Sequence, residues 1–263
     1  MPVVDGHQPG MPSWTDLGTP DVDAAVAFYF RLFGWENRSA GPVEQTGGYG
    51  FFLKDGHLVA GFGPLMQEGQ PPAWTIYIAV TDADATAQLA REHGGIVHVE
   101  PMAVLDSGRL TIIEDPTGGV FGTWEPGTHR GAELVNEPGS LTWAELATRD
   151  PDAAKPFYTA LFGWTPEDNP MGGAPYTVFR LGEANAAGMV AMDDGWPADM
   201  PAHWQAYFAV EDCDATIDRV VDLGGKTLHG PVDIEIGRFA IVTDPFGALF
   251  GVIAPAQTPG GAA

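Results

Sequence analysis

The chain has 263 residues, and its 12 lysines and arginines stand against 35 aspartates and glutamates, which gives a formal net charge of −23 at pH 7. This charge repels phosphate backbones and anionic lipid surfaces, so we expect neither nucleic acid nor a membrane as a partner. A neutral or cationic small molecule is the electrostatically easier ligand, although the same acidity also keeps an abundant protein soluble.

Cysteine content and apolar runs narrow the class of protein further. Cys213 is the only cysteine, which excludes an intrachain disulfide and a thiolate metal site. The first residues show no basic region followed by an apolar one, and no stretch approaches the ~20 apolar residues of a membrane span. We therefore expect a cytoplasmic protein.

The first quarter of the chain predicts one helix among several strands. Residues 21–33 place apolar side chains at helical spacing, with Asp21 suited to the N-cap and Gly34 to the C-cap. Asp55-Gly56 is a strong hairpin signal. Alternating or apolar runs predict strands at 13–18, 49–53 and 58–62.

The second quarter repeats this order after a proline-rich link. Residues 82–93 predict a helix that Gly94-Gly95 ends. Strands are predicted at 74–80, 96–104, 109–114 and 120–124. Each quarter therefore consists of a strand, a helix and further strands.

The second half of the chain repeats the first in the same order and at nearly the same spacing. Trp14-Thr-Asp-Leu, followed by FYFRLFGW, reappears as Trp143-Ala-Glu-Leu, followed by FYTALFGW. Asp115-Pro-Thr-Gly likewise recurs as Asp244-Pro-Phe-Gly. The repeat predicts a first module over 1–126, a linker over 127–139 and a second module over 140–263. We expect the modules to pack about a pseudo-twofold axis in a monomer, or in a homodimer.

These motifs resemble those of the vicinal oxygen chelate superfamily, which includes glyoxalase I, the bleomycin-resistance proteins and the extradiol dioxygenases. The chain is most similar to the two-module, glyoxalase-like proteins of actinobacteria. The resemblance rests on D-x-D-A-A-x-x-F-Y-x-x-L-F-G-W, an aromatic-led strand ending Ala-Val-x-Asp, a Gly-Gly pair and Asp-Pro-x-Gly. It implies an α+β fold of four βαβββ units, whose curved mixed sheets form a cup around a ligand in each module.

In metal-dependent members of that family, ligands come from the first strand, from the strand that ends in the Ala-Val-like pair, and from the last strand. The resemblance places Trp14, Thr75 and Gly122 at these positions in the first module, and Trp143, Gln205 and Gly251 in the second. Tryptophan and glycine offer no side-chain ligand to a divalent ion. We therefore expect no metal and no other cofactor.

Strand alternation indicates which side chains fill each cup instead. If Trp14 and Trp143 face inward, so do Asp16 and Glu145, because side chains two apart share a face. The same rule adds Thr75 and Tyr77 to the first cup and His203, Gln205 and Tyr207 to the second. Arg109 and Arg238 also recur at strand starts, where they either reach a ligand oxygen or pair with a nearby acid.

The candidate catalytic residues are Glu145, Asp16, His203 and Tyr207, and the candidate ligand-binding residues are Trp14, Thr75, Tyr77, Trp143, Gln205, Arg109 and Arg238. Plainer roles compete with these: the tryptophans pack in the core, the acids pair with the arginines, and His203 lies at the surface.

Two functions stay open for such a cup. One is a metal-independent enzyme of lyase, isomerase or hydroxylase type acting on a small carbonyl or phenolic compound, with an acid that moves a proton. The other is a non-catalytic protein that sequesters a planar ligand between aromatic side chains. Ordinary glyoxalase or dioxygenase activity ranks third. We expect the second cup to be the better site, because Glu145 reaches further than Asp16 and its neighbouring strand is more polar.

Overall fold

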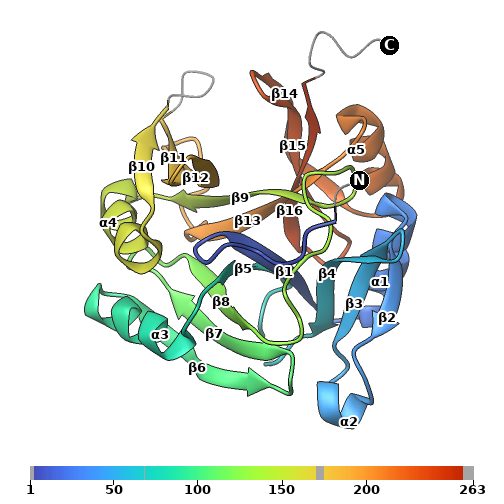
Figure 1. The fold of residues 1–263 in the computed structure, drawn as a ribbon. Helices are drawn as coiled ribbons and strands as arrows, with labels where there is room; N and C mark the ends of the chain where they lie inside the picture. The colour runs from blue at the N-terminus through green and yellow to red at the C-terminus, as the bar shows by residue number, and fades with distance from the viewer. Residues whose placement is uncertain (1–2, 68, 170–174, 257–263) are drawn as a thin grey trace, which may run out of the picture.

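Two modules, each with one eight-stranded mixed sheet, make up the protein (Figure 1). The computed structural model describes residues 3–67, 69–169 and 175–256. Within these ranges, no helix has both the length and the apolar character needed to cross a membrane.

The first sheet consists of two βαβββ units. The first unit contains β1 (Pro12–Thr19), α1 (Val22–Phe33), β2 (Glu36–Ser39), α2 (Val43–Thr46), β3 (Gly50–Lys54) and β4 (His57–Pro64). The second unit contains β5 (Ala73–Ala79), α3 (Ala83–Glu92), β6 (Ile96–Val104), β7 (Gly108–Glu114) and β8 (Val120–Pro126). The strand order is β2-β3-β4-β1-β5-β8-β7-β6, so the two units meet at the antiparallel pair β1 and β5.

The second sheet repeats this plan. Its first unit contains β9 (Leu141–Thr148), α4 (Pro151–Phe162), β10 (Thr165–Asp168), β11 (Tyr176–Leu181) and β12 (Ala184–Ala191). Its second unit contains β13 (His203–Ala209), α5 (Cys213–Asp222), β14 (Lys226–Ile234), β15 (Gly237–Thr243) and β16 (Leu249–Pro255). The order is β10-β11-β12-β9-β13-β16-β15-β14. The predicted α+β fold of four βαβββ units is confirmed.

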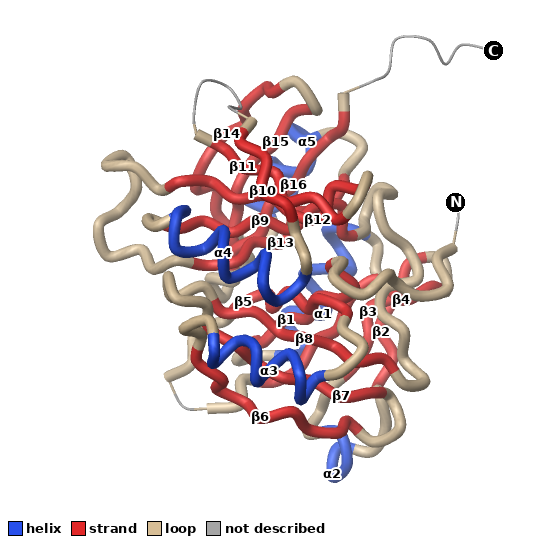
Figure 2. Tube along the Cα trace, turned by 60° about the vertical axis from the view of Figure 1, so that its left-hand side comes forward, coloured by secondary structure: helices blue, strands red, loops and turns tan. Residues whose placement is uncertain are grey.

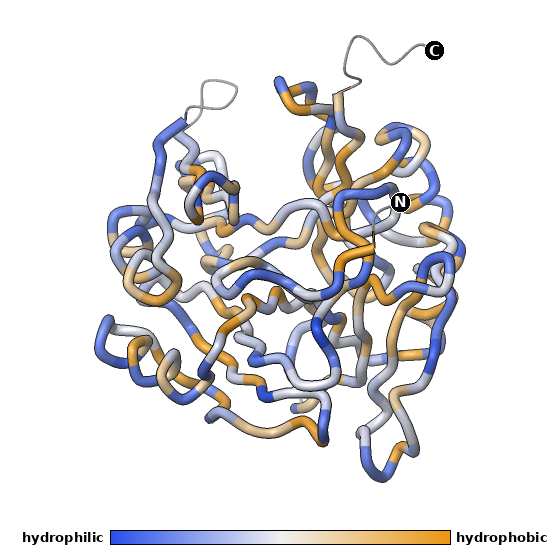
Figure 3. The backbone as a smooth tube through the Cα atoms, viewed as in Figure 1, coloured by the Kyte–Doolittle hydropathy of each residue, from blue (hydrophilic) through white to orange (hydrophobic). Residues whose placement is uncertain are grey.

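Local sequence signals explain where the long helices begin and end. Asp21 accepts a hydrogen bond from Ala24 N at 3.0 Å, and Gly34 ends α1 in the left-handed conformation with φ of 72°. Asp82, Asp150 and Asp212 cap α3, α4 and α5 in the same way. Figure 3 shows hydrophilic and hydrophobic residues alternating along α3, which buries Ala83, Ala87 and Ala90. The edge strand β2 was not predicted, because all four of its residues are exposed and show no apolar alternation.

The two sheets pack against each other around β5 and β13, and one hydrophobic cluster spans both modules. Trp74 of β5 and Phe208 of β13 lie with ring centroids 5.1 Å apart. Helix α1 lies beside α5, and α3 lies beside α4, as Figures 1 and 2 show from two sides. The concave faces of the sheets therefore point away from the shared core.

Each module also sends a tyrosine hydroxyl into a turn of the other. Tyr158 of α4 donates to Asp115 Oδ2 at 2.6 Å, and Tyr29 of α1 donates to Asp244 Oδ2 at 3.3 Å. Both aspartates belong to Asp-Pro-x-Gly turns, where they also accept backbone N–H groups. The Phe-Tyr pairs of α1 and α4 lie in the hydrophobic core, and their tyrosine hydroxyls also connect the two modules.

Replacing Tyr158 with Phe should lower the free energy of unfolding by about 1–3 kcal/mol, because it deprives buried Asp115 of a short hydrogen bond. Tyr29→Phe is the matched variant and should lose less, since its hydrogen bond to Asp244 is longer. Urea unfolding of both variants measures the difference. A smaller loss in Tyr158→Phe than in Tyr29→Phe would contradict this view of the interface.

Candidate functional site

The concave face of each sheet gathers an acid, a tryptophan and a tyrosine from its two central strands. In the second module, Glu145 lies opposite Gln205, and Trp143 lies opposite Tyr207. In the first module, Asp16 lies opposite Thr75 and Trp14 opposite Tyr77. Because directly opposed residues share a face, the structure brings together the residues that alternation grouped in each cup.

Glu145 is held by two tyrosines. Tyr207 donates to its Oε1 at 2.7 Å, and Tyr176 donates to its Oε2 at 2.8 Å. Trp143 Nε1 donates in turn to the Tyr176 hydroxyl at 2.9 Å, which fixes the direction of this chain of hydrogen bonds. Burial raises the pKa of Glu145, and the two tyrosine hydrogen bonds oppose that rise.

Asp16 has a similar set of neighbours in the first module. Tyr49 donates to Asp16 Oδ2 at 3.1 Å and accepts from Trp14 Nε1 at 3.0 Å. Burial raises the pKa of Asp16 to about 6, against the opposing effect of hydrogen bonds from Tyr49 and Tyr77. Sequence reasoning missed Tyr49 and Tyr176 as site residues. Tyr49 immediately precedes β3 and Tyr176 begins β11, and this similar position was the available signal.

Glycines make room for these tyrosines. A Cβ at Gly188 would overlap the Tyr176 hydroxyl, and one at Gly61 would overlap that of Tyr49. Gly251 leaves the corresponding space for the ring of Tyr207. Each glycine therefore permits a close approach that any other residue would block.

The linker occupies the first cup. His129 lies with its ring centroid 4.5 Å from that of Trp14 and 5.6 Å from those of Phe51 and Trp124. Its carbonyl accepts from Trp124 Nε1 at 2.9 Å. Burial lowers the pKa of His129 to about 4, so the ring is neutral at pH 7. With Trp14 only 4% exposed, the aromatic floor of this cup is covered.

The second cup has a more open aromatic floor. Trp143 is partly exposed, and among the described residues it stacks on no aromatic ring. Val178 lies opposite Gly188, just as Phe51 lies opposite Gly61 in the first module. The second cup therefore has a valine where the first has a phenylalanine. The described part of the chain thus leaves the indole of Trp143 accessible beside Glu145.

The remaining candidates of β13 lie on the face that carries Glu145. His203 Nδ1 is 2.9 Å from the Pro201 carbonyl oxygen, and His203 Nε2 is buried without a partner. Gln205 is 4% exposed, and its Nε2 has no partner within hydrogen-bond geometry. The amide lies near the Tyr207 hydroxyl, where it opposes the rise that burial causes in the pKa of Tyr207. Thr75 is the partly buried counterpart of Gln205 in the first cup.

Both arginine candidates pair with nearby acids, which is the second of the two roles that the sequence left open for them. Arg109 pairs with Asp84 at 2.7 Å, and Arg238 pairs with Asp214 at 2.9 Å. Arg109 shares its strand face with Ile113, which lies in the core between the modules. The arginines therefore bind surface acids near the helices, and neither contacts Asp16 or Glu145.

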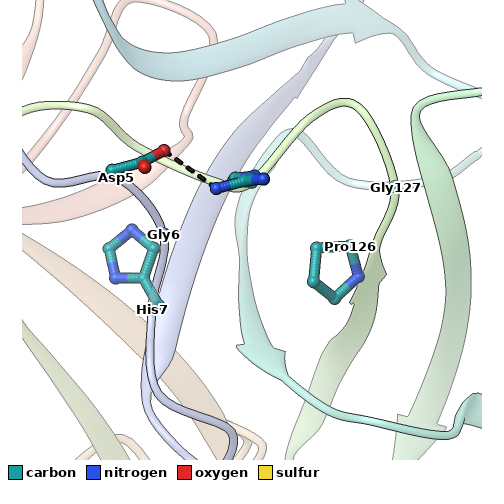
Figure 4. Close-up of a pocket in the computed structure, with 6 residues that line it drawn as sticks. Asp5, Gly6, His7, Pro126 and Gly127 are labelled. Atoms are coloured by element: carbon teal, nitrogen blue, oxygen red, sulfur yellow. Dashed lines mark hydrogen bonds and ion pairs between the residues drawn. The ribbon is translucent and has the colours of Figure 1, made fainter.

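Two hollows lie elsewhere on the protein. One has a volume of about 510 Å³ and lies between the N-terminal segment and the linker, where Asp5 pairs with Arg130 at 3.0 Å (Figure 4). The other, of about 400 Å³, lies beside α4 and includes Lys155 and Asp168. Neither is lined by Asp16 or Glu145, but Tyr176, which donates to Glu145, also lines the second hollow.

The model of the Glyoxalase/Bleomycin resistance protein/Dioxygenase superfamily matches residues 12–121 and 140–252. The protein named "Putative glyoxylase CFP32" of Mycobacterium tuberculosis (strain CDC 1551 / Oshkosh) is 41% identical over 262 residues, which cover 97% of this chain and 99% of that protein. "Anthracycline biosynthesis protein DnrV" of Streptomyces peucetius is 41% identical over 261 residues, covering 93% of each.

Solved structures show the same fold at low identity. The Mn(II)-bound glyoxalase from Novosphingobium aromaticivorans has a TM-score of 0.64 and 17% identity, covering 95% of this chain and 83% of that one. The 2,3-dioxygenase LapB from Pseudomonas sp. KL28 has a TM-score of 0.62 and 14% identity, covering 95% and 94%.

The residues at the metal positions of this fold do not fit a metal ion. A Cβ at Gly122 would overlap the ring of Tyr77, and Gly251 meets Tyr207 in the same way, so a longer ligand side chain has no space there. Trp14 and Trp143 bring no metal-binding atom. Among the described residues, no group of three or more His, Cys, Asp or Glu is placed to hold an ion.

Protein purified without chelators should therefore carry no stoichiometric divalent metal. Elemental analysis by mass spectrometry checks this, with the buffer as the blank. Zinc, nickel, manganese or iron near one per chain would show that the ligand positions are assigned wrongly.

Asp16 should make stability depend on pH in a defined direction. Its carboxyl binds a proton with a pKa of about 6 in the folded protein, against an ordinary value of 3.8, so the folded state gains protons first as pH falls. As the pH falls from 7 to 5, the free energy of unfolding of the native protein should therefore rise relative to that of Asp16→Asn. Asp23→Asn, which alters an exposed acid, is the control. Parallel curves for the native protein and Asp16→Asn would refute the shift.

Proposed function

The chain belongs to the glyoxalase/bleomycin resistance protein/dioxygenase superfamily, and from this premise we propose that its second cup binds a small planar molecule with carbonyl or phenolic oxygens, from which Glu145 accepts a proton. The observation that carries the proposal is the pair of hydrogen bonds from Tyr176 and Tyr207 to one partly buried carboxylate. Among the described residues, Glu145 forms no ion pair.

A carboxylate in this setting is a stronger base than an exposed one. Burial raises its pKa toward neutrality, which favours proton transfer from a weak acid at physiological pH. The tyrosines fix the orientation of the carboxylate, and each oxygen keeps a second lone pair for the ligand. In the proposed step, the ligand's O–H or activated C–H bond breaks, its proton goes to a Glu145 oxygen, and the electron pair stays on the ligand as a phenolate or enolate.

Trp143 supplies the surface for a flat ligand. Its indole is partly exposed and lies next to the acid, and its N–H is already used by Tyr176, so its remaining contribution is an apolar face. The relative from Streptomyces peucetius is named for anthracycline biosynthesis. We take from that name the class of ligand proposed here, a polycyclic aromatic compound with hydroxyl and carbonyl groups.

A non-catalytic binding protein is the second candidate. Both oxygens of Glu145 already accept a tyrosine hydrogen bond, and this arrangement suits a carboxylate that only accepts a further hydrogen bond from a bound ligand. The net charge of −23 also favours a cationic ligand in this case.

Glu145→Gln distinguishes the two candidates, because the amide keeps the shape of the side chain but cannot take up the proton. A role in proton transfer predicts at least a ~100-fold loss of turnover, whereas a role in binding predicts only a modest change in affinity. Turnover and dissociation constants are measured on hydroxyanthraquinones found by screening. Asp16→Asn, in the cup that the linker fills, is the matched control. Equal effects of both substitutions, or none from Glu145→Gln, would leave the second cup without a role.

A further inference from the structure

Strand β13 carries two buried polar atoms that the protein itself leaves unpaired. They are Nε2 of Gln205 and Nε2 of His203, two residues apart on the face that carries Glu145. A buried polar group without a partner is costly, and native proteins keep few of them. Two such atoms on one strand face, beside the partly buried Glu145, indicate that a bound molecule completes their hydrogen bonds.

The two atoms require hydrogen-bond partners of opposite kinds. His203 Nδ1 lies 2.9 Å from a carbonyl oxygen, which can only accept, so Nδ1 carries the proton and Nε2 of the neutral ring is an acceptor. Nε2 of the Gln205 amide is a donor. The complementary ligand therefore presents an acceptor oxygen to Gln205 and a donor hydroxyl to His203.

The arrangement is confined to the second cup. Gln205 lies directly opposite Glu145, and His203 is about 6.6 Å further along the strand, at ~3.3 Å per residue. The matching positions of the first module hold Thr75 and Ala73, which cannot present this pair. The other unpaired buried atoms of the described residues belong to Thr111, Thr123, Thr227 and His129, outside the second cup's central strands.

We propose that Gln205 and His203 determine the specificity of the second cup by recognising a carbonyl oxygen and a separate hydroxyl on one planar ligand. This inference rests on the proposed function and narrows its ligand class to hydroxyquinones and hydroxyaryl ketones whose hydroxyl is not hydrogen-bonded to their own carbonyl. Gln205 then provides the hydrogen bond to the carbonyl in the place where metal-dependent relatives of this fold have a metal ligand.

Three probes separate the two contacts: 2-hydroxyanthraquinone has both groups, anthraquinone has only carbonyls, and 2-hydroxyanthracene has only a hydroxyl. Gln205→Met keeps the length of the side chain without a donor, and His203→Phe removes the acceptor. Binding is followed by tryptophan fluorescence quenching in the full-length protein. Thr111→Val, which removes another unpaired buried hydroxyl far from the cup, is the matched control and should leave all three affinities unchanged.

Gln205→Met should weaken binding of both quinones about 10-fold and leave 2-hydroxyanthracene unchanged, because one hydrogen bond of this kind is worth about that factor. His203→Phe should weaken both hydroxylated probes about 10-fold and leave anthraquinone unchanged. Gln205→Met should lose no stability in urea unfolding, since it removes an unpaired donor, whereas His203→Phe should lose only the contribution of the hydrogen bond from Nδ1 to the Pro201 carbonyl. An equal loss of affinity for all three probes, or no loss for any of them, would overturn the assignment of Gln205 to the carbonyl and His203 to the hydroxyl.

The same experiment separates this inference from the proposed function. Binding that Glu145→Gln weakens but Gln205→Met and His203→Phe do not would overturn the specificity pair alone. If neither Glu145→Gln nor Trp143→Ala changes the affinity, the probe binds outside the second cup, and both the specificity pair and the proposed function are overturned. A native protein that binds none of the three probes overturns both as well.

Discussion

One partly buried carboxylate on the concave face of each sheet, with no cation beside it among the described residues, determines the design of both cups. A buried acid needs hydrogen-bond donors, and here tyrosine hydroxyls provide them. A tyrosine so close to a strand needs a glycine on its neighbour, and Gly61 and Gly188 meet that need. The same space requirement explains Gly122 and Gly251, the positions that the family resemblance assigned to metal ligands.

The two cups differ in how far they are covered, and the linker causes this difference. After β8 it passes over the first cup and places the neutral ring of His129 against Trp14 and Phe51. The described residues cover Trp143 with no such ring. The back-to-back packing of the sheets keeps the cups on opposite sides, so filling one leaves the other open.

The sequence was informative wherever a short pattern determines a structure. The aspartate caps, the Asp55-Gly56 turn and the facing of Asp16 and Glu145 all follow from local rules. Tyr49 and Tyr176 were not predicted as site residues, because each donates to an acid on a strand that is distant in the sequence. Alternation along β7 would have placed Arg109 outside the cup, since Arg109 shares a strand face with buried Ile113. No local pattern predicts that His129 enters a cup, because that contact depends on the path of the linker across the sheet.

The central claim is that the second cup holds the ligand while the linker holds the first. A crystal structure of the complex with 2-hydroxyanthraquinone tests it most directly. The account predicts one molecule against the indole of Trp143, within hydrogen-bond distance of Glu145, with His129 still in the first cup. A molecule bound against Trp14 with the linker displaced, and an empty second cup, would contradict it.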